Sequence, residues 1–268
     1  MLLNTVEVEK PWGVDKLPQG FDYPGGKKIG EIWFDRPGDP LPLLIKWLFT
    51  SERLSIQVHP NDEQANDRGL KSGKEECWAI VAAEPGAKLG IGTIRPLSLD
   101  ELREASLNGK IENLMDWKPV RAGDFFYIPA GTVHAIGAGI SLIEVQQNAD
   151  VTYRLYDYGR PRELHLDDGV AVSRPEPYAD PRSGRMATAG LQQLVDGPLF
   201  RLWQGGGAEV ASLIAASDEP SWLIPVEGKI ETGDGERAGP GDCLYLQPGA
   251  KIAASESSRM LVARNGTV

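Results

Sequence analysis

The chain has 268 residues, 41% hydrophobic and 25% charged, which is the composition of a soluble globular protein with one large or two modest domains. Its formal net charge of -10 argues against nucleic acid or an anionic membrane as the main partner, because both require a basic face. The two cysteines, Cys77 and Cys243, lack the spacing of a disulfide framework, and no stretch approaches the roughly 18 apolar residues of a membrane helix. A reducing cytoplasm is therefore the expected compartment.

Short strands dominate the predicted secondary structure. The 31 glycines and 20 prolines, with little helical periodicity, favour a mainly β chain of many strands joined by turns. The first clear strands are expected at residues 29–34, 43–49 and 54–59. The second of them is almost wholly apolar but carries Lys46 at its centre. Residue type alone places this lysine at the surface, where its ammonium group can reach water.

Period-two alternation gives the third strand a polar face. Ser55, Gln57 and His59 share one side of it, and the apolar residues share the other. Three polar side chains in register suit a cavity, because the interior of a barrel alternates with its outer layer. The same alternation over residues 73–81 allows only one of two adjacent glutamates to face that cavity, and it groups Glu76 with Lys74.

Helical patterns are confined to two segments. Residues 98–117 combine apolar spacing with a capping box, in which Ser98 is followed three residues later by Glu101, and Gly109 is expected to divide the segment into two short helices. The other helical segment, a short helix, is expected between residues 163 and 172. Prolines, charges and small residues in the following segment, 175–184, predict a linker.

One motif occurs twice. A short strand, a Pro/Gly turn and His134 follow one another over residues 123–134, and residues 241–249 repeat the strand and turn at an offset of 118 residues. Ile252 stands at the position equivalent to His134. The repeat predicts two related β units, which we delimit as a metal-binding unit of residues 1–175 and a metal-free unit of residues 185–268.

The chain has three histidines, and each is a candidate metal ligand or catalytic residue. A lone histidine is more often a surface or hydrogen-bonded group than a ligand, and His165, beside an expected helix start, fits that description. His59 and His134 differ, because a glutamate and a glutamine accompany them on expected cavity-facing positions. Two histidines and a carboxylate are typical ligands of catalytic zinc, and the same set also suits Fe(II) or Mn(II).

The repeated motif resembles the second signature of the cupin superfamily, with Ala138 where an asparagine is usual. More specifically, the chain is similar to the compact bacterial form of type I mannose-6-phosphate isomerases from residues 10–13 through residues 162–165. The strongest segments are residues 54–60, 73–78, 123–134 and 152–157. The resemblance implies a mainly β fold of two cupin-like barrel or jelly-roll units with a few short helices.

The resemblance also implies a set of site residues. The zinc ligands of the family fall on Gln57, His59, Glu76 and His134, with one Zn2+ expected per chain. The active-site arginine matches Arg154, and a lysine that holds substrate oxygens or phosphate matches Lys74. The positions around the phosphate and the pocket floor match Ser55 and Lys46, which moves this lysine from the surface into the pocket. The acidic positions match Glu144 and Asp150, and each has two interpretations, proton transfer or a salt bridge to Arg154.

The implied activity is the interconversion of mannose 6-phosphate and fructose 6-phosphate by a cytoplasmic monomer or homodimer. Lys46, Lys74 and Arg154 would supply the local positive charge that an anionic sugar phosphate needs in an acidic chain. The alternative is a metal cupin with a different role, either a sugar-binding or regulatory module or an Fe(II)-dependent oxygenase. Sugar binding without turnover would not require Arg154 and Lys74 together.

Overall fold

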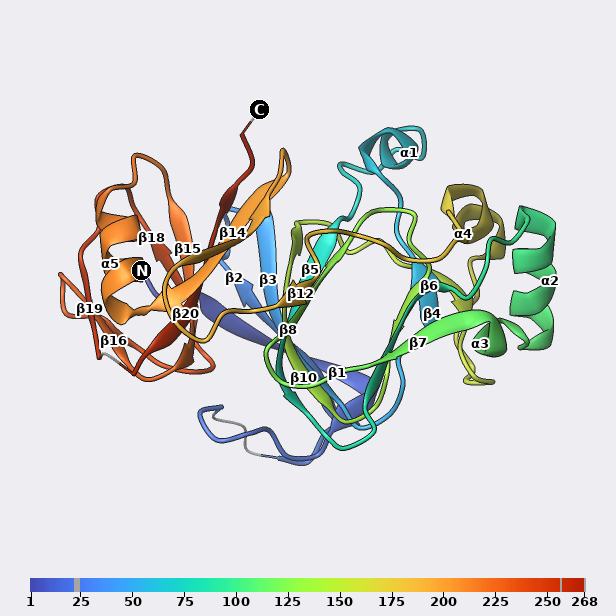
Figure 1. Ribbon diagram of the computed structural model, residues 1–268, viewed down its shortest axis with the longest axis horizontal. Coiled ribbons are helices and arrows are strands. Elements are labelled where there is room, and N and C mark those ends of the chain that lie inside the picture. The colour runs from blue at the N-terminus through green and yellow to red at the C-terminus, as the bar shows by residue number, and fades with distance from the viewer. Residues whose placement is uncertain (22–24, 256, 268) are drawn as a thin grey trace.

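The computed structural model describes residues 1–21, 25–255 and 257–267. Strands dominate it, as the sequence predicts, and within the described residues they form four antiparallel sheets. A seven-stranded and a five-stranded sheet lie together on one side of the molecule, and a five-stranded and a three-stranded sheet from the C-terminal part of the chain lie beside them (Figure 1). Each helix in the described part of the chain is too short or too polar to span a membrane.

The first unit consists of two facing sheets. The seven-stranded sheet contains, in spatial order, β1 (Asn4–Val14), β2 (Ile29–Asp35), β3 (Leu43–Thr50), β10 (Ile140–Gln147), β5 (Glu76–Ala83), β8 (Asp124–Ile128) and β12 (Gly184–Arg185). The five-stranded sheet contains β11 (Tyr153–Tyr156), β4 (Ile56–Val58), β9 (His134–Ile136), β6 (Lys88–Thr93) and β7 (Met115–Pro119). This arrangement is cupin-like and matches the predicted fold class.

Four short helices belong to this unit, and three of them lie outside the five-stranded sheet (Figure 1). They are α1 (Asp62–Asn66), α2 (Leu99–Asn108), α3 (Ile111–Leu114) and α4 (Leu166–Val172). The predicted break at Gly109 is confirmed, since this residue ends α2 with φ 77°, a conformation that favours glycine. The prediction of helix as far as residue 117 is wrong, because Met115 already pairs with Thr93 of β6.

The second unit repeats the strand order of the first. Its larger sheet contains β13 (Gln192–Asp196), β14 (Phe200–Gly206), β20 (Arg259–Asn265), β15 (Ser221–Glu227) and β18 (Leu244–Leu246). Its smaller sheet contains β17 (Arg237–Ala238), β16 (Ile230–Thr232) and β19 (Ile252–Ala254). The helix α5 (Gly207–Ala215) connects β14 to β15, in the place where β4 connects β3 to β5 in the first unit.

The sequence repeat corresponds to one turn formed twice. Asp124 accepts a hydrogen bond from the Arg121 N–H at 2.9 Å, and Asp242 accepts one from the Gly239 N–H at 2.8 Å. The glycine before each aspartate has a positive φ, 87° at Gly123 and 99° at position 241. The glycine and aspartate recur because both turns have the same local geometry. The second turn forms without a histidine after it.

The two units share a hydrophobic core. The outer face of the seven-stranded sheet contributes residues such as Trp47, Phe125 and Ile143, and the second unit contributes Phe200 and Trp222. The N-terminal residues also reach across to the second unit, where Leu3 N–H donates to the Cys243 carbonyl at 2.9 Å. We propose residues 1–175 and 185–268 as the two units, with β12 of the connecting segment pairing with β8 at the edge of the first unit's sheet. The two units pack as neighbours with a continuous interior.

Candidate metal centre and pocket

Strand register brings charged side chains together on the inner face of the seven-stranded sheet. Lys46 on β3 lies directly opposite Glu144 on β10, which lies directly opposite Trp78 on β5. Residues directly opposite in an antiparallel pair project to the same face. Glu76 is two residues before Trp78 on β5, so its side chain points to this inner face as well. Glu75 points the other way and accepts a hydrogen bond from the Tyr127 hydroxyl, as the alternation predicts.

His59, Glu76 and His134 form a buried group whose candidate ligand atoms all lie within 4.8 Å of one another. The Nε2 atom of His59 is 3.5 Å from one carboxylate oxygen of Glu76, and Nε2 of His134 is 3.4 Å from the other. Gln57 on β4 is the cross-strand partner of His134 on β9, and its amide nitrogen lies 3.3 Å from His134 Nε2. The four predicted ligands therefore come together from three separate segments.

The donor set fits a divalent cation. His134 Nδ1 donates to the Thr132 carbonyl at 2.9 Å, which leaves the Nε2 lone pair directed at Glu76. Burial lowers the pKa of His59 well below its usual value and that of His134 to about 4, so both rings are neutral near pH 7. Burial, followed by the charge of Glu144, raises the pKa of Glu76 to about 7, and Glu76 Oε1 is buried without a hydrogen-bond partner. A cation would satisfy this oxygen.

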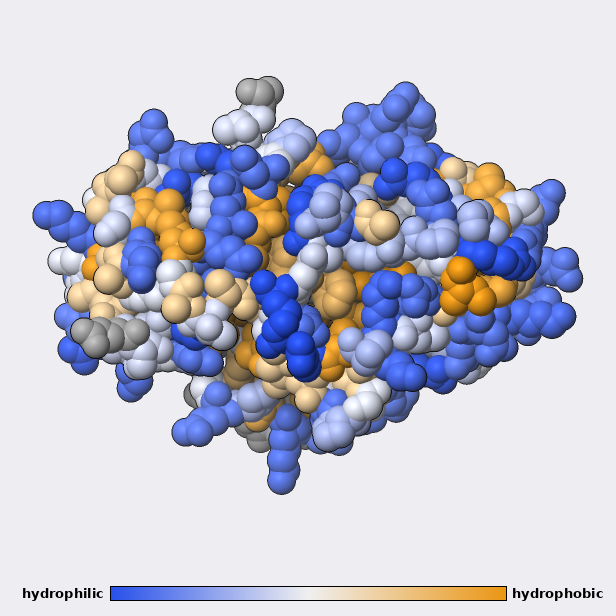
Figure 2. Space-filling model, in the orientation of Figure 1, coloured by the Kyte–Doolittle hydropathy of each residue, from blue (hydrophilic) through white to orange (hydrophobic). Residues whose placement is uncertain are grey.

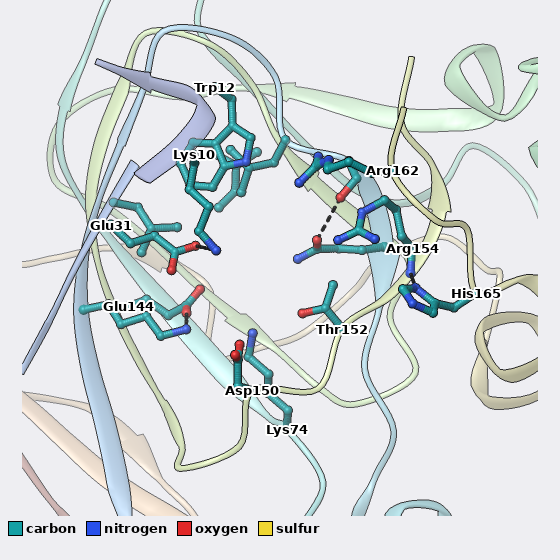
Figure 3. A pocket seen from close by; sticks show the side chains of 16 residues that line it. Lys10, Trp12, Glu31, Lys74, Glu144, Asp150, Thr152, Arg154, Arg162 and His165 are labelled. Atoms are coloured by element: carbon teal, nitrogen blue, oxygen red, sulfur yellow. Dashed lines mark hydrogen bonds and ion pairs between the residues drawn. The ribbon is translucent and has the colours of Figure 1, made fainter. Parts of the chain in front are cut away.

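A cavity of about 360 Å³, whose lining side chains are drawn in Figure 3, adjoins the metal group through Gln57 and Lys74. Seven of the predicted site residues line it: Lys46, Ser55, Gln57, Lys74, Glu144, Asp150 and Arg154. Lys74 links the cavity to the metal group, because its Nζ lies 3.0 Å from a Glu76 oxygen and 3.3 Å from His59 Nε2. Burial disfavours the charged form of Lys74, but the nearby carboxylates of Glu76 and Glu144 outweigh it and raise its pKa. This lysine is therefore a cation at the pocket floor.

Lys46 lies inside the pocket, so the surface position suggested by its residue type alone is wrong. Its side chain is only 4% exposed, and Nζ lies 3.2 Å from a Glu144 oxygen and 4.6 Å from the ring centre of Trp33. Trp78 Nε1 donates to the other Glu144 oxygen at 3.0 Å. Burial raises the pKa of Glu144, but the positive charges of Lys46 and Lys74 outweigh burial, so the net effect lowers this pKa. Glu144 thus pairs with Lys46, and the alternative salt bridge to Arg154 is not formed.

Arg154 differs from the other cations that line the pocket. Each of the others has an ion-pair partner within 4.0 Å: Lys10 with Glu31, Lys46 with Glu144, Lys74 with Glu76 and Arg162 with Asp157. Arg154 donates from Nη1 to the Glu163 carbonyl at 2.8 Å, and it pairs with no carboxylate among the described residues. Burial, followed by the charge of Arg162, lowers the pKa of Arg154. Arg154 is therefore the positive charge that an anion in the pocket could neutralise.

The lining residues that were not assigned from the sequence comprise three aliphatic side chains, Leu48, Leu54 and Ile136, and six others: Lys10, Trp12, Glu31, Thr152, Arg162 and His165. Figure 3 shows Lys10, Glu31 and Glu144 facing Arg154, Arg162 and His165 across the cavity. Lys10 and Arg162 lie in the segments where the family resemblance begins and ends, which was the only sequence signal for them. Their approach to the pocket depends on the packing of β1 and of the segment after β11, which no local periodicity reveals.

The facing antiparallel sheets and the buried His59, Glu76 and His134 group define the chain as a cupin with a candidate metal centre. Most of the side chains that line this pocket are polar or charged, and hydrophilic residues also cover much of the molecular face seen in Figure 2. Comparison with known proteins then identifies the family.

Residues 26–91 match the family described as phosphomannose isomerase type I, catalytic domain. The chain is 37% identical over 216 residues to a mannose-6-phosphate isomerase of Streptococcus mutans, covering 76% of this chain and 67% of that protein. Its structure matches that of the mannose 6-phosphate isomerase from Bacillus subtilis with a TM-score of 0.81, 28% identity and 98% coverage of both chains. A zinc-bound mannose 6-phosphate isomerase shares the fold with a TM-score of 0.71 and 15% identity, with 99% of both chains covered. The chain belongs to the type I mannose-6-phosphate isomerase family.

Proposed function

We propose that the protein is a zinc-dependent aldose–ketose isomerase that interconverts mannose 6-phosphate and fructose 6-phosphate. The observation that carries the proposal is the combination of a buried His59, Glu76 and His134 group with a pocket in which Arg154 has no carboxylate partner among the described residues. Membership of the family supports the reaction, and the unneutralised arginine supports an anionic substrate. Neither feature is required of a protein that only binds a neutral sugar.

The metal would be held by Gln57, His59, Glu76 and His134, one ion per chain. The Gln57 amide oxygen accepts from the Ser55 hydroxyl at 3.1 Å, and a half-turn of the amide would direct this oxygen at the metal group instead. Two imidazoles and a carboxylate favour zinc. Zinc supplies Lewis-acid polarisation of the substrate oxygens.

The substrate phosphate would bind Arg154, with Ser55, Lys46 and Lys74 as further contacts. A guanidinium presents a planar set of donors that fits a phosphate; the Nε of Arg154 is buried, and its Nη2 donates to no described residue and is the donor left for the phosphate. The substrate would thus be fixed at its charged end, which orients the sugar carbons within the cavity.

The reaction must move a proton between C2 and C1 and another between their oxygens, so it needs a positioned acid or base and cations near the developing oxyanion. Lys74, charged and beside the metal group, would stabilise that oxyanion. Glu144 and Asp150 both line the pocket and are our candidates for proton transfer. Asp150 is exposed and has no ion-pair partner among the described residues, whereas Lys46 and Trp78 hold Glu144 in place.

The remaining parts of the proposal concern the setting of the enzyme. A sugar phosphate would be its small-molecule partner, the cytoplasm its compartment, and a monomer or homodimer its assembly. A role as a sugar-binding module or an Fe(II)-dependent oxygenase would use the same metal group without isomerising mannose 6-phosphate.

Metal content and turnover measured on the same samples test the proposal. The wild-type protein should bind one zinc per chain and isomerise mannose 6-phosphate in a coupled assay, and His134→Ala should lose both. Arg160→Ala is the matched control, because Arg160 pairs with Asp157 and Glu52 and does not line the pocket. Turnover by His134→Ala at the wild-type rate would contradict the proposed role of the metal group.

A further inference from the structure

His165, the third histidine of the chain, is tied to Arg154 by two hydrogen bonds. Its backbone N–H donates to the Arg154 carbonyl at 2.8 Å, and its ring Nδ1 accepts from the Arg154 backbone N–H at 3.2 Å. The residue immediately precedes α4, and its own carbonyl accepts from Gly169 N–H at 2.8 Å. The backbone and one ring nitrogen are therefore fixed relative to the arginine.

The hydrogen bond at Nδ1 determines which ring nitrogen carries the proton. A backbone N–H can only donate, so Nδ1 must offer its lone pair. A neutral imidazole has one N–H, which therefore resides on Nε2. The ring borders the pocket beside the Arg154 side chain (Figure 3), and Nε2 makes no hydrogen bond to a described residue. The pocket wall next to Arg154 thus has a fixed donor that the described part of the protein leaves unused.

We propose that His165 is a substrate-binding residue that donates a hydrogen bond from Nε2 to the phosphate held by Arg154. This inference rests on the proposed function, because it takes the phosphate of the substrate as the ligand. A fixed tautomer suits this role, because a fully ionised phosphate oxygen only accepts and a donor oriented in advance requires no reorganisation on binding. His165 would then add one hydrogen-bond donor to those that Arg154 offers to the phosphate.

Two substitutions separate ligand binding from simple positioning of Arg154. In His165→Asn the side-chain oxygen can replace Nδ1 as the acceptor for the Arg154 N–H, but no group reaches the Nε2 position. In His165→Gln the amide nitrogen can reach the Nε2 position, but the acceptor is lost. A hydrogen bond to a charged partner corresponds to a roughly 10- to 100-fold change in affinity, so His165→Asn should raise KM by that factor while His165→Gln stays within about threefold of wild type. A near-wild-type KM for His165→Asn, or equal losses in both variants, would overturn the proposal.

Nuclear magnetic resonance of 15N-histidine-labelled protein provides a readout that does not depend on turnover. With three histidines in the chain, His165→Gln assigns the signals by removing one set. We expect an unprotonated Nδ1 and a protonated Nε2 on His165, and a shift of the Nε2 signal when inorganic phosphate is added. A proton on Nδ1, or an Nε2 signal that phosphate does not move, would refute the inference. If phosphate moves the signal but mannose 6-phosphate is not isomerised, the proposed function fails and the phosphate donor stands.

Discussion

Replacing Arg154 with alanine should abolish most of the turnover and leave the metal content unchanged. The guanidinium uses Nη1 for the Glu163 carbonyl, and its Nε is buried, so Nη2 is the donor left for the substrate among the described residues. A hydrogen bond to a charged group contributes about 1.5–3 kcal/mol. The loss of this bond equals a roughly 10- to 10²-fold reduction in kcat/KM.

The measurement is a coupled isomerase assay on protein whose zinc content is determined on the same preparation. Arg160→Ala serves as the control, because it removes a nearby guanidinium that does not line the pocket. Less than a tenfold loss of kcat/KM in Arg154→Ala would refute the proposed contact with substrate. Loss of zinc would show that Arg154 supports the metal group instead, although it lies outside the His59, Glu76 and His134 cluster.

Three further predictions concern the metal group, the buried charges and the second unit. Glu76→Gln removes the anionic ligand, so zinc affinity should fall at least roughly tenfold in a competition titration; unchanged affinity would exclude Glu76 as a ligand. Lys46→Met leaves the buried charge of Glu144 without its 3.2 Å partner, so a denaturant titration should show a loss of about 3–5 kcal/mol in the free energy of unfolding. Wild-type stability would show that Lys74 alone neutralises Glu144. Wild-type protein and Arg264→Leu should both hold one zinc per chain, and a second zinc in either protein would disprove a metal-free second unit.

The last prediction follows from what replaces the metal group in the second unit. Glu76 lies opposite Ile128 in the first unit, and Ser221 lies opposite Leu246 in the second; Leu246 is the residue that the repeat places in the position of Ile128. Arg264 donates from Nε to the Ser221 hydroxyl at 2.9 Å, and α5 stands where β4 carries Gln57. A hydroxyl paired with a guanidinium fills the equivalent space, so the scaffold is retained without its ligands.

Local patterns predicted part of the metal group. Alternation placed Gln57 and His59 on one face and allowed only one of Glu75 and Glu76 to face the cavity, which requires only the period of a strand. The family resemblance assigned Glu76 and His134 as ligands, and the structure brings both to His59. The family resemblance then added Lys74 and the other pocket residues, all of which the structure brings to one cavity.

Long-range contacts explain what the sequence did not reveal. The partner of Glu144 depends on the register between β3 and β10, and the hydrogen bonds between Arg154 and His165 depend on where α4 packs. The start of α1 does have a local signal in the sequence, the capping box formed by Asn61 and Gln64. At residue 115, tertiary pairing with β6 prevailed over the helical pattern.

The most direct test of the account is to follow mannose 6-phosphate by nuclear magnetic resonance in the presence of the zinc-loaded protein. We predict that fructose 6-phosphate appears until equilibrium is reached, and that removal of zinc by a chelator stops the conversion until zinc is restored. Unchanged mannose 6-phosphate in the presence of protein with one zinc per chain would contradict the proposed isomerase activity.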